Sequence, residues 1–111
     1  MLDKIAEIRR SYRTGVLDET HLHADPIAMF TDWMRAAMES GIDEPNGMTL
    51  ATVSADGAPS ARVVLLRGFD ARGFVFFTNY ESAKGRDLLA NPRAAAAFWW
   101  QPLEQIGRAH V

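Results

Sequence analysis

Two apolar segments joined by Asp56-Gly57 constrain the fold of this chain more than any other feature. Asp-Gly between apolar runs is a strong signal for a hairpin turn. The first segment, MTLATVSA, covers residues 48–55, and the second, ARVVLLRGF, covers 61–69. The sequence DARG predicts another turn, which leads to a third strand, GFVFFTN, at 73–79. Strands joined by such tight turns pair in an antiparallel way, so this part of the chain predicts a β-meander.

Two helices are predicted before the meander. Residues 2–14 carry apolar side chains at helical spacing. The second helix has Asp25 as a predicted N-cap, Pro26 at its first position and Gly41 as its stop. Both of these predicted helices precede every predicted strand along the chain.

The chain after the meander predicts one more helix and one more strand. Ser82 can cap a short helix that ends before Pro92, and RAAAAFWW at 93–100 reads as a strand. We therefore expect an α+β fold with two N-terminal helices, about four antiparallel strands and one inserted helix. Closure of the sheet into a small β-barrel would hide its edges.

Composition limits the classes of function. The chain has 111 residues, 48% of them hydrophobic and 23% charged, which suits one globular domain with a modest core. Its net charge of −2 provides no basic field for nucleic acid or an anionic membrane. No apolar run approaches the ~20 residues of a membrane span, the N-terminus is unlike a signal peptide, and cysteine is absent. We therefore expect a cytoplasmic protein with no nucleic-acid or membrane partner.

Basic residues stand where the apolar patterns of the hairpin end. Arg62 and Arg67 flank an apolar run, and because Arg67 comes five residues after Arg62, a regular strand would place their side chains on opposite faces. Ser82 and Lys84 lie at a predicted helix start, where free amides and the helix dipole favour an anion. A phosphate cradle is one interpretation. Solvated charges at the ends of strands and helices are the other, and the pattern alone favours these.

Longer stretches of the chain resemble one enzyme family. The sequence ARVVLLRGFDARGFVFFTNYESAKGRDLLANPRAAAAFWWQPLE at 61–104 resembles pyridoxamine 5′-phosphate oxidase, the FMN enzyme that makes pyridoxal 5′-phosphate. IAEIRRSYRTGVLDE, ADPIAMFTDWMRAA and EPNGMTLATVSADGAPSARVVLLR resemble earlier segments of that family, so the likeness covers residues 4–104. The resemblance implies an FMN-binding split β-barrel that dimerises, with FMN held between subunits. It also implies oxidation of pyridoxamine or pyridoxine 5′-phosphate by O₂ with release of H₂O₂, a step of vitamin B6 salvage and biosynthesis.

The resemblance also implies the binding residues. Those expected to bind FMN are Arg62, Val63, Val64, Leu65, Leu66, Arg67, Phe77, Thr78 and Lys84. Those expected to bind substrate are Arg9, Arg10, Ser11, Tyr12 and, again, Arg67. Arg67 stands where the family usually has lysine, and Ala83 stands where it usually has arginine. No catalytic acid or base is required, and no metal site is expected, since His21 and His23 lack a third ligand.

Two alternative functions stay open from the sequence. A related split-barrel flavoenzyme could oxidise another substrate, such as a phenazine precursor. The domain could instead be a non-catalytic module that binds FMN or pyridoxal phosphate. Tight binding without O₂ consumption would favour the second alternative, and a panel of substrates would test the first.

The last seven residues, QIGRAHV at 105–111, depart from the family pattern, which continues with Arg-Gln-Val. One reading frame of a widely used sequencing adapter encodes these residues. We therefore expect residues 1–104 to be a partial split-barrel domain and 105–111 to be a read-through tail. A partial barrel should leave strand edges unpaired and expose Phe98, Trp99 and Trp100, with little activity on its own.

Overall fold

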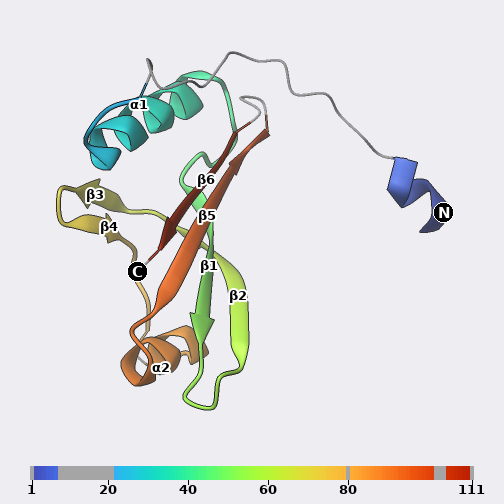
Figure 1. Cartoon of the computed structure of the whole chain (residues 1–111), viewed down its shortest axis with the longest axis vertical. Coiled ribbons are helices and arrows are strands. Elements are labelled where there is room, and N and C mark those ends of the chain that lie inside the picture. The colour runs from blue at the N-terminus through green and yellow to red at the C-terminus, as the bar shows by residue number, and fades with distance from the viewer. Residues whose placement is uncertain (1, 8–21, 80, 102–104, 111) are drawn as a thin grey trace.

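A computed structural model describes residues 2–7, 22–79, 81–101 and 105–110 (Figure 1). The elements in chain order are the 3₁₀ helix η1 (Leu2–Glu7), α1 (Pro26–Glu39), β1 (Gly47–Val53), β2 (Pro59–Leu65), β3 (Gly68–Asp70), β4 (Gly73–Val75), α2 (Ala83–Ala90), β5 (Ala94–Trp100) and β6 (Gln105–His110). The helix predicted over 2–14 is thus a 3₁₀ helix as far as Glu7, and residues 8–14 lie outside the described part of the chain. Among the described helices, none is long and apolar enough to cross a membrane.

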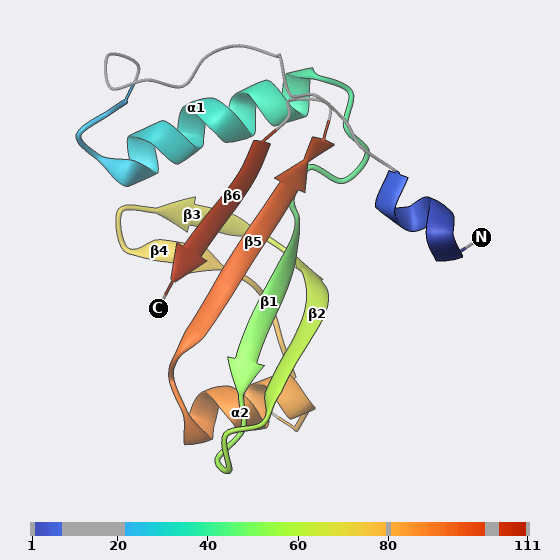
Figure 2. The same ribbon diagram turned by 45° about the vertical axis from the view of Figure 1, so that its right-hand side comes forward.

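The main sheet has four antiparallel strands in the order β2-β1-β5-β6. The β1–β2 hairpin turns at Asp56-Gly57 as predicted, with the Ser54 N–H donating to the Ala58 carbonyl at 2.9 Å. Gly57 has φ +90°, a conformation that glycine adopts without a steric cost. Figures 1 and 2 show α1 across one end of this sheet, beside β3 and β4, and α2 at the opposite end.

The strand predicted over 61–69 is broken in the structure. β2 ends at Leu65, and the next strand, β3, pairs with β4 in a separate two-stranded sheet. The backbone changes partners at the break, because the Leu66 N–H donates to the Asn46 carbonyl and the Arg67 N–H donates to the Val75 carbonyl, both at 2.8 Å. The prediction of one continuous strand was wrong at this point, and the third predicted strand ends at Val75 instead of residue 79.

The core lies between α1, the inner face of the main sheet and the β3–β4 sheet. Phe30 of α1 is central to it, with ring centroids 4.9 Å from Phe69 and 5.3 Å from Phe98. Phe98 and Trp100 are each only 1% exposed, so the expectation that these rings are exposed was wrong. The indole N–H of Trp100 also donates to the Pro45 carbonyl at 2.9 Å. Trp99, on the other face of β5, is 66% exposed as expected.

Helix α1 begins and ends where the sequence predicts. The Asp25 carboxylate accepts a hydrogen bond from the Ile27 N–H at 2.9 Å, and Pro26 is the first helical residue. The C-cap is Ser40, and Gly41 follows with φ +82°, the left-handed conformation that commonly ends a helix.

Residues 105–110 form β6, which pairs with β5 from Trp100↔Gln105 to Ala95↔His110. A strand at this place gives β5 a second neighbour and leaves β2 at the other edge of the sheet. Strand pairing uses backbone groups, which every sequence has, so the pairing of β6 does not test whether residues 105–111 are a read-through tail. The read-through tail stays a prediction, which re-reading the gene past the codon for residue 104 from independently prepared genomic DNA would decide.

Candidate functional site

Five of the residues expected to bind a cofactor line one open hollow of about 270 Å³: Val64, Leu65, Arg67, Phe77 and Lys84. They come from the end of β2, the residue pair that follows it, the segment after β4 and the first turn of α2. These segments are separated in sequence by a complete hairpin, so the fold brings the residues together. The hollow therefore combines apolar side chains with two cations.

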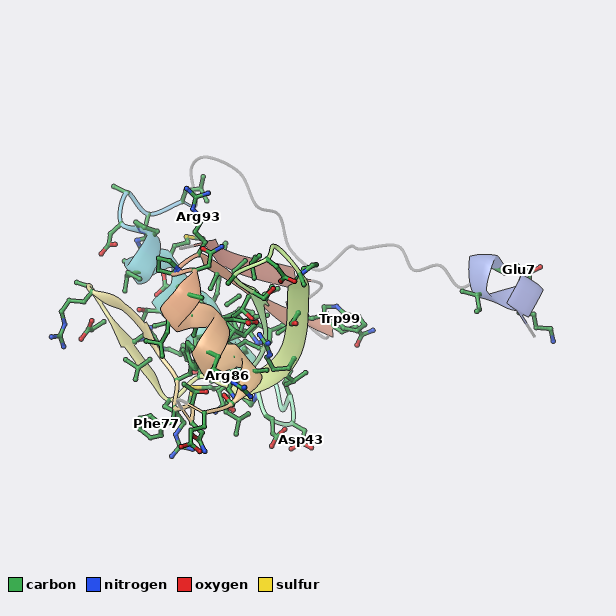
Figure 3. All side chains as sticks on the ribbon, turned by 90° about the horizontal axis from the view of Figure 1, so that it is seen from below. Glu7, Asp43, Phe77, Arg86, Arg93 and Trp99 are labelled. Carbon is green, nitrogen blue, oxygen red and sulfur yellow. The ribbon has the colours of Figure 1, made fainter. Side chains whose placement is uncertain are left out.

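Arg67 lies over an exposed aromatic ring at this hollow. Its guanidinium carbon is 5.3 Å from the centroid of Phe77, which is within cation–π range. Phe77 is 72% exposed, an unusual state for a phenylalanine. Figure 3 shows Phe77 pointing away from the core. Among the residues that the structure describes, neither Arg67 nor Lys84 has a carboxylate within ion-pair distance.

The N-terminus of α2 is built around Ser82. Its hydroxyl accepts from the Gly85 N–H at 3.2 Å and donates to the Asn79 carbonyl at 2.7 Å, and it lies 3.3 Å from the Thr78 hydroxyl. The first intrahelical bond runs from the Arg86 N–H to the Ser82 carbonyl at 2.9 Å. The N–H groups before it point out of the helix start, where the dipole is positive. The N-cap predicted from sequence is thus formed, and it places Lys84 in the first turn.

Arg62 does not line the hollow but lies in a polar cluster between β1, β2 and α2. Its Nη1 donates to the Leu50 carbonyl at 3.1 Å and to the Thr52 hydroxyl at 2.7 Å, and its Nη2 lies 3.9 Å from Asp87 Oδ2. The Thr52 hydroxyl donates to the same Asp87 oxygen at 2.8 Å. The prediction that Arg62 and Arg67 lie on opposite faces assumed one regular strand, but Arg67 lies beyond the end of β2; Arg62 is partly buried and Arg67 is exposed.

The remaining predicted residues lie in different surroundings. Val63 is 73% exposed on the outer face of β2, whereas the Leu66 side chain is 4% exposed and belongs to the core. Thr78 is partly buried beside Ser82. The four predicted substrate-binding residues Arg9, Arg10, Ser11 and Tyr12 lie outside the described residues.

Sequence reasoning missed Thr52 and Asp87. Thr52 is 1% exposed on the face of β1 that also carries Met48 and Leu50, so strand alternation could have identified a polar residue at a core position. Asp87 follows Lys84 by three residues, a spacing that places both on one side of a helix. Neither signal is specific without the structure.

No metal site is found among the described residues, in which no cluster of three or more histidine, cysteine or carboxylate residues is suited to hold an ion. The Nε2 atom of His23 lies 2.5 Å from the Asp32 carboxylate, and both side chains are about half exposed. His21, the other member of the His-x-His pair, lies outside the described residues.

Comparison with known proteins gives consistent relatives. A family model described as pyridoxamine 5′-phosphate oxidase matches residues 34–111. The pyridoxine/pyridoxamine 5′-phosphate oxidase of Cupriavidus metallidurans is 58% identical over 104 residues, which is 94% of this chain and 49% of that protein. The protein of the same name from Bordetella petrii is 55% identical over 101 residues, or 91% of this chain and 48% of that protein. The chain thus spans about half the length of the curated relatives it matches.

Two solved structures resemble the model. PhzG from Burkholderia lata 383, solved in complex with tetrahydrophenazine-1-carboxylic acid, has a TM-score of 0.80 and 30% identity over 86% of this chain and 48% of PhzG. A pyridoxamine 5′-phosphate oxidase-related, FMN binding protein from Nostoc punctiforme PCC 73102 has a TM-score of 0.67 and 22% identity over 80% of this chain and 46% of its own, a likeness of fold alone. The split-barrel fold class predicted from the sequence is confirmed. With 78 of its 111 residues, 34–111, matched by the family model, the chain belongs to the pyridoxamine 5′-phosphate oxidase family.

Proposed function

We propose that the protein containing this chain binds FMN and oxidises pyridoxamine or pyridoxine 5′-phosphate to pyridoxal 5′-phosphate, with O₂ reduced to H₂O₂. The observation that carries the proposal is the hollow in which Arg67 and Lys84 flank the exposed ring of Phe77. The chain spans about half of its curated relatives, so the activity is proposed for the whole protein.

The residues of the hollow fit the chemistry of FMN. FMN has a planar aromatic ring system and a phosphate, and the hollow offers Val64, Leu65 and Phe77 for the faces of the rings. Lys84 and the N-terminal amides of α2 suit the phosphate, because a helix start and a lysine both favour an anion. The hollow of about 270 Å³ is smaller than the ~300–1,000 Å³ of typical ligand pockets. This chain therefore supplies part of a flavin site.

Bound FMN supplies a two-electron acceptor that O₂ can reoxidise with formation of H₂O₂. The substrate carbon that bears the amine or alcohol would lose two electrons and two protons. The alcohol becomes the aldehyde directly, whereas the amine becomes an imine, which water hydrolyses to the aldehyde with release of ammonia. The role of this chain is to anchor and orient, because its described site residues are cations and apolar groups instead of an acid–base pair. Arg67 is proposed to contact the substrate phosphate, for which the guanidinium fork is suited.

A second copy of the whole protein is the proposed partner. The outer face of the main sheet pairs small residues in register, Ala61 with Ala51 and Ala51 with Ala95, between exposed Val63 and Trp99. Exposed apolar faces of this kind are typical of protein–protein contacts. We propose a homodimer that completes the flavin site, in the cytoplasm, with which the absence of cysteine accords.

The proposal can be tested with a chimera in which residues 1–104 are joined to the C-terminal half of the C. metallidurans relative. We call this chimera the extended protein. FMN binding is measured by quenching of flavin fluorescence, and O₂ uptake and H₂O₂ are measured with both B6 phosphates. FMN binding with turnover of either substrate supports the proposal, and absence of FMN binding refutes it. FMN binding without O₂ uptake would instead favour a non-catalytic module.

The related-flavoenzyme alternative has one observation in its favour, the TM-score of 0.80 to PhzG in its phenazine complex. Identity argues the other way, with 30% to PhzG against 58% to the C. metallidurans oxidase. A reduced phenazine carboxylic acid is therefore included in the substrate panel. Turnover of that compound without turnover of either B6 phosphate would replace the proposed substrate.

A further inference from the structure

Thr52, Arg62 and Asp87 form a polar cluster where α2 packs on the main sheet, and of the three only Arg62 is among the residues expected from the sequence to bind FMN. The side chains of Arg62 and Asp87 are 23% and 13% exposed, and Thr52 is 1% exposed. Charged groups are rarely buried to this extent unless they are paired. We call these three residues the Asp87 cluster.

The hydrogen bonds of the Asp87 cluster fix the Arg62 guanidinium in one orientation. Nη1 uses its two protons on the Leu50 carbonyl and the Thr52 hydroxyl. That hydroxyl uses its own proton on Asp87, so it accepts from Arg62 while it donates to the carboxylate. Nη2 lies 3.9 Å from Asp87 Oδ2, too far for a hydrogen bond, so no described residue accepts a hydrogen bond from the Nε–Nη2 edge, which has the geometry to bind two oxygens of an anion.

The same contacts fix helix α2 relative to the hairpin. Asp87 lies one turn after Lys84, so the contact with Thr52 sets the depth and rotation of the helix that carries Lys84 and the Ser82 cap. Asp87 thus links Arg62 of β2, which we take as a second phosphate cation, to the helix that carries Lys84.

We propose that Asp87 is a positioning residue for the FMN phosphate, acting through Thr52 and Arg62 and through the placement of α2. The inference rests on the proposed function. Charge and positioning predict opposite changes in FMN affinity. A carboxylate near a phosphate repels it, so by charge alone the removal of Asp87 would tighten FMN binding. Positioning predicts that removal of the oxygen acceptor weakens binding.

Two substitutions in the extended protein separate charge from position. Asp87→Asn keeps an oxygen that can accept from Thr52 and removes the charge, so its Kd for FMN should stay within about threefold of the unsubstituted value or fall below it. Asp87→Ala removes the acceptor and should raise that Kd by about tenfold or more. Thr52→Val should repeat the effect of Asp87→Ala, and Thr52→Ser should restore binding.

Riboflavin, which lacks the phosphate, distinguishes positioning from general damage to the fold. Its Kd should be the same in all variants, whereas a destabilised protein would lose both ligands together. Asp70→Ala is the matched control, because Asp70 is an exposed carboxylate that contacts Arg72 on the β3–β4 turn. Amide hydrogen exchange at Gly85 and Arg86, whose N–H groups are bonded to the Ser82 hydroxyl and carbonyl, should be faster in Asp87→Ala than in Asp87→Asn, with or without ligand.

The outcomes separate this inference from the function on which it rests. If the unsubstituted extended protein fails to bind FMN, the proposed function fails. If it binds FMN and Asp87→Ala binds equally well or more tightly, only the positioning role is overturned. Equal loss of FMN and riboflavin in Asp87→Ala also overturns it, because the residue would then be structural alone.

Discussion

Phe98 and Trp99 are neighbours on β5 that should respond in opposite ways to the same truncation. Phe98 is 1% exposed and packs against Phe30, Phe74 and Trp100, with ring centroids 5.3, 6.3 and 5.4 Å away. Trp99 is 66% exposed and projects from the other face of the sheet (Figure 3). Replacement of either by alanine removes an aromatic ring from the same strand, so the pair isolates the effect of burial.

The expected free energies of unfolding follow from these exposures. Phe98→Ala should lose about 3–5 kcal/mol, the usual cost of removing a buried aromatic ring together with the cavity that it leaves. Trp99→Ala removes a side chain about one third of which is covered, so its loss should be about 1 kcal/mol or less. Folded domains have about 5–15 kcal/mol of stability in total, so the first change consumes a large part of it.

Urea unfolding of the 111-residue chain, followed by far-UV circular dichroism, measures both losses. Circular dichroism is chosen because a change of tryptophan content would alter a fluorescence signal directly. With a slope of about 2 kcal/mol per molar urea, the midpoint should fall by about 2 M for Phe98→Ala and by about 0.5 M or less for Trp99→Ala. Equal shifts for the two variants, or a larger shift for Trp99→Ala, would refute the burial of Phe98 under α1.

Three further predictions concern the site and one surface charge. Lys84→Ala in the extended protein should raise the Kd for FMN by about tenfold and leave riboflavin binding unchanged, because the lysine is proposed to pair with the phosphate; equal loss of both ligands in a fluorescence titration would contradict this. Ala83→Arg restores the family's usual residue at the exposed first position of α2 and should tighten FMN binding by about tenfold. Ala90→Arg, at the other end of the helix, is its control. An unchanged FMN titration for Ala83→Arg would rule out a contact between this arginine and FMN. The Arg72 side chain, followed by its backbone N–H, holds the pKa of Asp70 below the usual value, so this contact stabilises the fold at neutral pH and is lost as pH falls through the folded-state pKa; Arg72→Ala should move the Asp70 carboxyl titration, followed by NMR, upward.

Sequence reasoning succeeded where local chemistry determines the structure. The Asp56-Gly57 turn and the Asp25 and Ser82 caps each follow from short-range rules, and the structure contains all three. These features depend on backbone conformation and helical spacing, which a few neighbouring residues set.

The failures concern contacts between residues far apart in sequence. Nothing local indicates that the backbone changes partners at Leu66, because the reason is the carbonyl of Asn46, twenty residues earlier. The burial of Phe98 likewise depends on α1, which precedes it by about sixty residues. The Thr52–Asp87 bond joins residues thirty-five apart. The periodicity of apolar residues and the secondary-structure propensities of single residues do not indicate which distant residues will pair.

In the proposed function, the hollow contacts the phosphate and one face of the flavin ring. Lys84, in the first turn of α2, lines the hollow, whereas Arg62 lies outside it in the Asp87 cluster. The open hollow has apolar residues on one side, with Phe77 largely exposed. A flat ring held on one face by such a surface stays open to water on the other, and oxidation of a bound substrate needs that face closed. The groups that would close it lie outside the hollow, so FMN binding and turnover are both tested in the extended protein.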